Sequence, residues 1–203
     1  MDPIFNSLDD IPFRYSIFEK DQVLTEGQLN SVRNYLDDQD RLSRIHLCGV
    51  GIIGGLQVAV DNQRVTLGKG LGVTTDGDLM VVPSPMVYTR FKPYDDSNPR
   101  YEPFFGGNGM FEIHELVASG VQDPQAKPLS GFRAETSSQL TDMFAVLFME
   151  SRIKVHDLCT GAGCDNHSSE YVGTQKLLLV DGSTMARLAP VIRSSGDVAG
   201  ELD

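Results

Sequence analysis

Residues 25–82, TEGQLNSVRNYLDDQDRLSRIHLCGVGIIGGLQVAVDNQRVTLGKGLGVTTDGDLMVV, carry the pattern that decides the fold of this chain. Thr25 and Gln28 have the spacing of a capping box, in which each side chain accepts a bond from the other residue's backbone amide at a helix N-terminus. Apolar residues then recur on roughly one helical face: Leu29, Val32, Leu36, Leu42 and Ile45. We therefore expect a long amphipathic helix that ends at Gly49, because glycine suits a helix C-terminus.

The glycines at positions 49–55 match the string G-x-G-x-x-G. A dinucleotide fingerprint needs a strand before its glycines and a helix after them, and here that order is reversed. We interpret these glycines as turns and points of close backbone approach. Short strand candidates follow at 56–60, 64–67 and 72–82, and the turns between them include the Asp76-Gly77 pair typical of tight hairpins. The stretch after the helix therefore predicts a β-meander.

Composition excludes some classes of function. The chain has 203 residues and a formal net charge of −11, which opposes binding to a nucleic-acid backbone because phosphate contacts need clustered Lys and Arg. No window approaches the 18 apolar residues of a membrane helix, and the N-terminus lacks the basic start and apolar core of a signal peptide. We therefore expect neither a nucleic-acid partner nor direct membrane insertion.

The second half is less regular. Prolines between residues 83 and 103 suggest an extended surface loop, and residues 111–119 read as a short helix closed by Gly120. The apolar run Met143–Met149 fits a central strand buried on both faces, with Lys176–Val180 as its companion. A short helix is expected from Ser183 to Leu188.

These elements predict an α+β fold in which the long N-terminal amphipathic helix packs on a mainly antiparallel sheet or meander. We divide the chain into an N-terminal arm at 1–24, which covers its own core or docks on a neighbour, and a helix-plus-meander module with a Pro-rich loop at 25–109. A second α+β portion at 110–192 either joins that domain or forms its own. A flexible tail completes the chain at 193–203.

One cluster of metal-binding residue types stands out: His156, Cys159, Cys164 and His167. Thiolate and imidazole in tetrahedral array suit zinc, although the four-residue gap between the cysteines is longer than usual. A Cys159–Cys164 disulfide and a pair of free thiols are the alternatives, and the absence of a signal peptide disfavours the disulfide. Cys48 is interpreted as a small buried hydrophobe. No acid, base and nucleophile converge at readable spacing, so no catalytic residue and no cofactor other than a possible structural zinc is assigned.

Several blocks resemble a known family. Residues 18–25 (FEKDQVLT), 35–42 (YLDDQDRL), 49–56 (GVGIIGGL) and 70–77 (GLGVTTDG), together with Cys159-x4-Cys164-Asp165, are similar to the N-terminal region of a structural protein that accompanies phage-like contractile injection systems. The glycine-rich blocks also look like strand-turn modules of baseplate and tail-fibre proteins. Members of that family are longer, so the resemblance implies a short variant or a first module.

The resemblance implies a non-enzymatic part of a particle, near its baseplate, spike or cage. Its partners would be baseplate, spike, sheath or tube subunits, with further copies of the chain in the same assembly. Such a protein would be made in the cytoplasm and incorporated into a particle that can be released from the cell. The alternative is a β-rich carbohydrate- or peptide-binding module of a fibre or receptor-binding protein.

Overall fold

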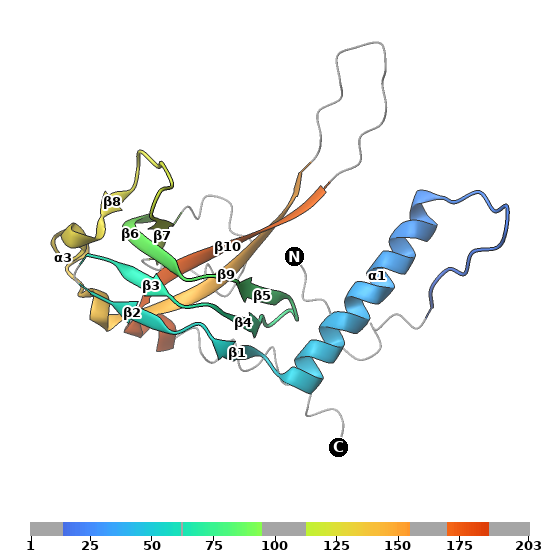
Figure 1. Ribbon diagram of the computed structural model, residues 1–203, viewed down its shortest axis with the longest axis horizontal. Helices are drawn as coiled ribbons and strands as arrows, with labels where there is room; N and C mark the ends of the chain where they lie inside the picture. Colours follow the sequence, from blue (N-terminus) through green and yellow to red (C-terminus); the bar gives the residue numbers. More distant parts are fainter. Residues whose placement is uncertain (1–13, 62, 95–112, 155–169, 187–203) are drawn as a thin grey trace, which may run out of the picture.

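The computed structural model describes residues 14–61, 63–94, 113–154 and 170–186 (Figure 1). These residues form an α+β structure whose strands all pair antiparallel. The α+β class and the mainly antiparallel sheet predicted from the sequence are thereby confirmed.

The helix α1 (Glu26–Ser43) begins at the predicted position. The Thr25 side chain accepts from the Gln28 amide, and the Gln28 side chain accepts from the Thr25 amide at 3.1 Å, so both halves of the capping box are present. The helix continues as one π-helical segment, η2 (Arg44–Cys48). It ends at Gly49, whose φ of 82° lies in the left-handed region that glycine tolerates best.

The meander consists of three long strands, each broken into two segments. The first is β1 (Gly51–Gly55) and β2 (Val58–Val60), the second β3 (Val65–Leu67) and β4 (Gly70–Val73), and the third β5 (Leu79–Val82) and β6 (Met86–Pro93). One set of segments forms a small sheet in the order β1-β4-β5, and the other set joins the larger sheet. The chain therefore passes between two sheets three times.

Glycines allow the first two strands of the meander to bend where they pass between the small and the larger sheet. A Cβ on Gly70 would lie 2.3 Å from the Leu56 backbone nitrogen, and a Cβ on Gly55 would lie 2.1 Å from the Lys69 carbonyl oxygen. Gly55 also has a φ of 70°. Among the glycines at 49–55, close backbone approach is confirmed at Gly55, where no side chain fits between the crossing strands, whereas a Cβ on Gly49, Gly51 or Gly54 would meet nothing within 4 Å. Residues 51–55 form strand β1 and not the turns that were expected there.

The larger sheet has the order β2-β3-β6-β7-β10-β9, with β8 (Lys127–Pro128) paired to β6. Its later strands are β7 (Ile113–Ala118), β9 (Met143–Lys154) and β10 (Glu170–Asp181). Short helical turns lie between β8 and β9: η3 (Leu129–Gly131), α3 (Phe132–Thr136) and η4 (Leu140–Asp142). Residues 182–186 are helical and overlap the helix predicted at 183–188, whose last two residues lie outside the described part of the chain.

Two of the expected elements differ in the structure. The segment predicted as a helix at 111–119 contains strand β7, in which Leu116 packs in the main core while Ile113 packs in a second cluster. That division follows the two-residue period of a strand. The supposed loop after residue 83 contains strand β6, whose prolines fall at or just before the strand's ends. Tyr88 and Phe91 both pack in the main core although they are three positions apart, and the pairing with β7 shifts register between Tyr88 and Arg90.

The predicted central strand is also displaced. Residues 143–149 begin β9, which pairs with the Lys176–Val180 segment of β10 as expected. However, β9 lies at one end of the sheet order, and β10 is the strand with neighbours on both sides. Four successive residues of β10, Leu177–Val180, are at most 3 % exposed, so the continuous apolar burial expected of a central strand belongs to β10.

The main core gathers residues from the meander and from the later strands. Its buried members are Leu56, Val65, Leu67, Val82, Tyr88, Phe91, Leu116, Leu129, Phe132, Leu177 and Leu179. Phe132 is one of its largest fully buried side chains, 1 % exposed, with its ring centroid 4.8 Å from that of Phe91. The segment from β8 to α3 thus supplies core side chains although its composition is rich in Pro, Gly and Ser.

The expected packing of the helix across the sheet differs from what the structure shows. Figure 1 shows α1 projecting from the β-structure with only its C-terminal end near the strands. Leu29 and Leu36, on the face predicted to be buried, are 50 % and 59 % exposed. The single buried residue of α1 is Arg41. An apolar stripe specifies that a face can be buried, but it does not specify by what.

Candidate functional site

An arginine-centred junction joins the projecting helix to the β-structure. The Arg41 side chain is only 4 % exposed, and its guanidinium contacts Asp78 at 2.7 Å and Asp37 at 3.0 Å. It also donates to the Asp76 carbonyl at 3.2 Å. One turn further on, Arg44 donates to the Gly77 carbonyl at 3.1 Å. The guanidinium groups of Arg41 at the end of α1 and of Arg44 at the start of η2 therefore hold the β4–β5 turn against the helix.

The turn approaches the helix too closely for a side chain. A Cβ on Gly77 would lie 2.8 Å from the Arg41 Cβ, and Gly77 has a φ of 81°. Burial raises the pKa of Asp76 and of Asp78, and the nearby positive charge of Arg41 opposes both shifts. The junction thus holds carboxylates in a partly dehydrated place where one buried arginine compensates their charge.

Exposed apolar side chains gather in the N-terminal part of the chain. Among the residues that the structure describes, most of the large apolar side chains that are more than a third exposed lie between residues 15 and 81. We define the N-terminal apolar set as the following members from the arm, α1, η2 and the small sheet: Ile17, Val23, Leu29, Leu36, Leu47, Ile52, Ile53, Leu79 and Val81. Exposed apolar groups concentrated in one part of a protein mark a contact site more often than scattered single ones do.

The N-terminal arm contacts α1, the helix that carries part of the N-terminal apolar set. The rings of Tyr15 and Tyr35 lie 4.8 Å apart and tilted by 34°. The arm therefore folds back toward α1 instead of joining the sheet. This contact leaves Ile17 at 78 % and Val23 at 85 % exposure. The arm and α1 together present apolar groups to solvent at a distance from the main core.

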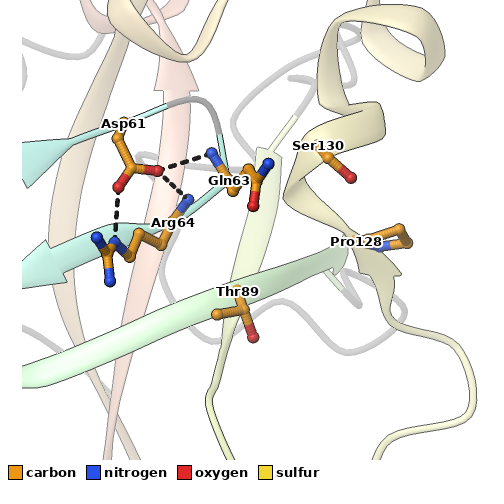
Figure 2. Close-up of a pocket in the computed structure, with 6 residues that line it drawn as sticks. All are labelled: Asp61, Gln63, Arg64, Thr89, Pro128 and Ser130. Atoms are coloured by element: carbon orange, nitrogen blue, oxygen red, sulfur yellow. Dashed lines mark hydrogen bonds and ion pairs between the residues drawn. The ribbon is translucent and has the colours of Figure 1, made fainter.

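A polar pocket of about 700 Å3 lies beside the β2–β3 turn. Figure 2 shows the side chains that line it: Asp61, Gln63, Arg64, Thr89, Pro128 and Ser130. Asp61 accepts from the Gln63 and Arg64 amides at 2.8 and 2.9 Å, and its carboxylate contacts Arg64 Nε at 2.6 Å. These bonds lower the pKa of Asp61, with the Gln63 amide as the largest cause. The pocket wall thus has a fixed ionised carboxylate beside hydroxyl and amide groups.

A row of alternating charges crosses four strands of the large sheet. Lys92 of β6, Glu115 of β7, Lys176 of β10 and Glu150 of β9 follow one another, with N–O distances of 3.8, 3.4 and 2.8 Å. A bond to Asp123 is the main cause that raises the pKa of Lys92. Burial lowers the pKa of Lys176, but its carboxylate partners outweigh that effect and raise it. Because the row compensates its own charges, we interpret it as support for the sheet.

The residues proposed as zinc ligands, His156, Cys159, Cys164 and His167, lie outside the described residues, so the zinc, disulfide and free-thiol alternatives stay hypotheses. Within the described ranges, no group of His, Cys, Asp or Glu could hold a metal ion. The interpretation of Cys48 as buried is wrong: it is an exposed free thiol at the end of η2, a segment with no buried residue.

Sequence reasoning missed Arg41 as the junction residue and did not foresee the pocket. The only sequence signal for the junction was the Asp76-Gly77-Asp78 turn. We assigned this turn to a hairpin and did not predict that it would contact the helix. None of the helices in the described ranges is both long enough and apolar enough to span a lipid bilayer. No protein-family model matches the chain, and no curated protein shows significant similarity to it.

Proposed function

We propose that this chain is a non-enzymatic structural component of a contractile injection system or phage-tail-like particle, acting through protein–protein contacts near the baseplate, spike or cage. The sequence resemblance suggests the particle. The observation that supports action by contact is the projection of α1 and its arm, with the N-terminal apolar set exposed on them and on the small sheet. The partners would be baseplate, spike, sheath or tube subunits.

The exposed groups are large enough to matter for binding. Complete burial of a Leu or Val side chain contributes about 1.5–3 kcal/mol, so covering the remaining half of Leu29 and of Leu36 would contribute roughly 1 kcal/mol each. Ile17 and Val23 would each contribute more because most of their surface is free. A partner groove that accepts the arm and α1 together therefore has several anchors of moderate strength.

The test is incorporation into particles. We would purify contractile particles from cells that make the tagged chain and measure its amount relative to the sheath subunit by mass spectrometry. The double variant Leu29→Glu/Leu36→Glu should reduce incorporation at least about tenfold, because a charge cannot enter an apolar groove unpaired. Val121→Glu, at a position 52 % exposed outside this set, is the matched control and should incorporate normally. Equal incorporation of both variants would count against the proposed contact.

The alternative is a carbohydrate- or peptide-binding module, and the polar pocket favours it. Its carboxylate, hydroxyl and amide groups are those that fix the orientation of polar ligands. A glycan array with the purified chain should then show hits that Arg64→Ala weakens. Hits that Leu36→Glu leaves unchanged would separate this function from assembly through α1.

A further inference from the structure

Strand β2 consists of apolar residues that are exposed to solvent in the single chain. Its residues Val58, Ala59 and Val60 are all exposed, although each is apolar. Neighbouring β3 is buried at Val65 and Leu67, which pair with Val60 and Val58. Val58 and Val60 therefore lie on the core face of the sheet yet remain 43 % and 42 % exposed. The core is left half-covered along this edge.

The hydrogen-bond pattern shows which backbone groups of β2 point away from β3. The Asp61 amide donates to the Arg64 carbonyl at 3.0 Å, and the Gly68 amide donates to the Gln57 carbonyl at 2.8 Å. Hydrogen-bonded and non-hydrogen-bonded positions alternate in an antiparallel ladder. Since residues 57 and 61 bond toward β3, Val58 and Val60 direct their N–H and C=O groups outward. In the described part of the chain, no other strand pairs with this edge.

This edge also lacks the features that usually prevent pairing. Exposed edges are normally protected by charged residues or proline. Residues 47–60 contain neither, although the whole chain has a net charge of −11. Two copies of so acidic a chain repel each other over most of their surface. An uncharged edge is where a second copy can approach at the lowest electrostatic cost.

We infer that β2 pairs with β2 of a second copy, antiparallel and about a two-fold axis at Ala59. Val58 of one copy would face Val60 of the second copy, and each such pair exchanges both of its outward N–H···O bonds. The opposed valines would cover the edge of both cores. Ala59 would face its own equivalent in a non-hydrogen-bonded pair, where strands approach most closely and a small side chain fits. The two larger sheets would become one.

This inference does not depend on the particle, so the purified full chain tests it. Sedimentation velocity at increasing concentration should show a reversible monomer–dimer equilibrium. Val58→Lys places an ammonium group against the opposed valine and should raise the dimer dissociation constant at least about tenfold. Val121→Lys adds the same charge at an exposed position outside the sheets and should leave the dimer unchanged. A chain that stays monomeric, or a dimer that Val58→Lys does not weaken, would overturn the inference.

A cross-linking test locates the axis even if the lysine variant fails to fold. In a background with Cys48, Cys159 and Cys164 replaced by Ser, Ala59→Cys should form a disulfide-linked dimer on mild oxidation. Non-hydrogen-bonded pairs have Cα atoms about 4.5 Å apart, within disulfide range. Thr66→Cys is the control. Thr66 of β3 is the pairing partner of Ala59, but it lies one strand further from the proposed two-fold axis. Equal cross-linking of both variants, or none by Ala59→Cys, would contradict the pairing.

Discussion

Replacing Arg41 by Ala tests how the projecting helix is held. The change removes a side chain that is 4 % exposed and leaves its partners without a counter-charge. Asp78 matters most, because its carboxylate is only 20 % exposed and lies 2.7 Å from the guanidinium. The carbonyl of Asp76 also loses its donor at 3.2 Å. Asp37, at 48 % exposure, contributes little because water can replace the arginine there.

The size of the effect follows from these contacts. A hydrogen bond to a charged group contributes about 1.5–3 kcal/mol when it is buried, and an exposed i,i+4 pair about 0.3–0.5 kcal/mol. We expect Arg41→Ala to lower the free energy of unfolding of the junction by about 2–4 kcal/mol. The matched control is Arg64→Ala, which removes a 2.6 Å pair with Asp61 whose side chains are 62 % and 49 % exposed. That control should cost at most about 1 kcal/mol.

Hydrogen exchange followed by mass spectrometry resolves where stability is lost. In Arg41→Ala, amides of α1 and of the β4–β5 turn should exchange faster, while those of β7 and β10 keep their protection, because the main core does not include the junction. Arg41→Lys should give an intermediate result, since an ammonium keeps the charge but cannot reach all three partners as a planar fork does. Unchanged exchange in α1, or an effect no larger than that of Arg64→Ala, would refute this account of the junction.

Three further variants examine separate parts of the fold. Phe132→Ala should lower the free energy of unfolding, measured by urea denaturation, by about 3–5 kcal/mol, because it leaves a cavity in the main core. A loss below about 1 kcal/mol would contradict this, since it would mean that neighbouring side chains fill the cavity. Gly77→Ala should destabilise by about 1–3 kcal/mol, since a methyl group would meet Arg41 at a positive φ, and a neutral result would mean that the turn does not contact the helix so closely. Burial raises the pKa of Asp181, but bonds from Ser183 and Thr184 outweigh it and lower the pKa to about 2. Its stabilisation is therefore complete above pH 3.8 and lost as the pH falls through about 2, so the difference in stability between wild type and Asp181→Ala should shrink over that range; a difference independent of pH would contradict this assignment.

Local signals predicted the elements whose causes are local. The capping box at Thr25 and the stop at Gly49 depend on groups within one helical turn, and both are present in the structure. Strands β2 and β3 were predicted for the same reason, because turn residues and alternation are readable over a few positions, whereas β1 was interpreted as turns because of its glycines. Strand β7 was mistaken for a helix, since a six-residue segment with apolar residues at positions 113 and 116–118 fits either period until its partners are known.

Positions that depend on distant partners could not be predicted. The helix stripe at Leu29 and Leu36 indicated a face suited to burial, yet no local pattern says whether the sheet or another molecule covers it. The burial of Arg41 arises from a turn more than thirty residues away, which periodicity does not encode. The pocket beside Asp61 likewise depends on Pro128 of β8 and Ser130 of η3, and β8 is placed by its pairing with β6.

The most direct test of the central claim, that this chain acts by contact through its projecting helix, is hydrogen exchange of the chain within purified particles and alone in solution. We expect α1, residues 14–24 of the arm and the small sheet to gain protection in the particle, while β7 and β10 of the main core stay unchanged. A chain that is absent from the particles, or one that is present but gains no protection in α1, would contradict the proposed mode of action.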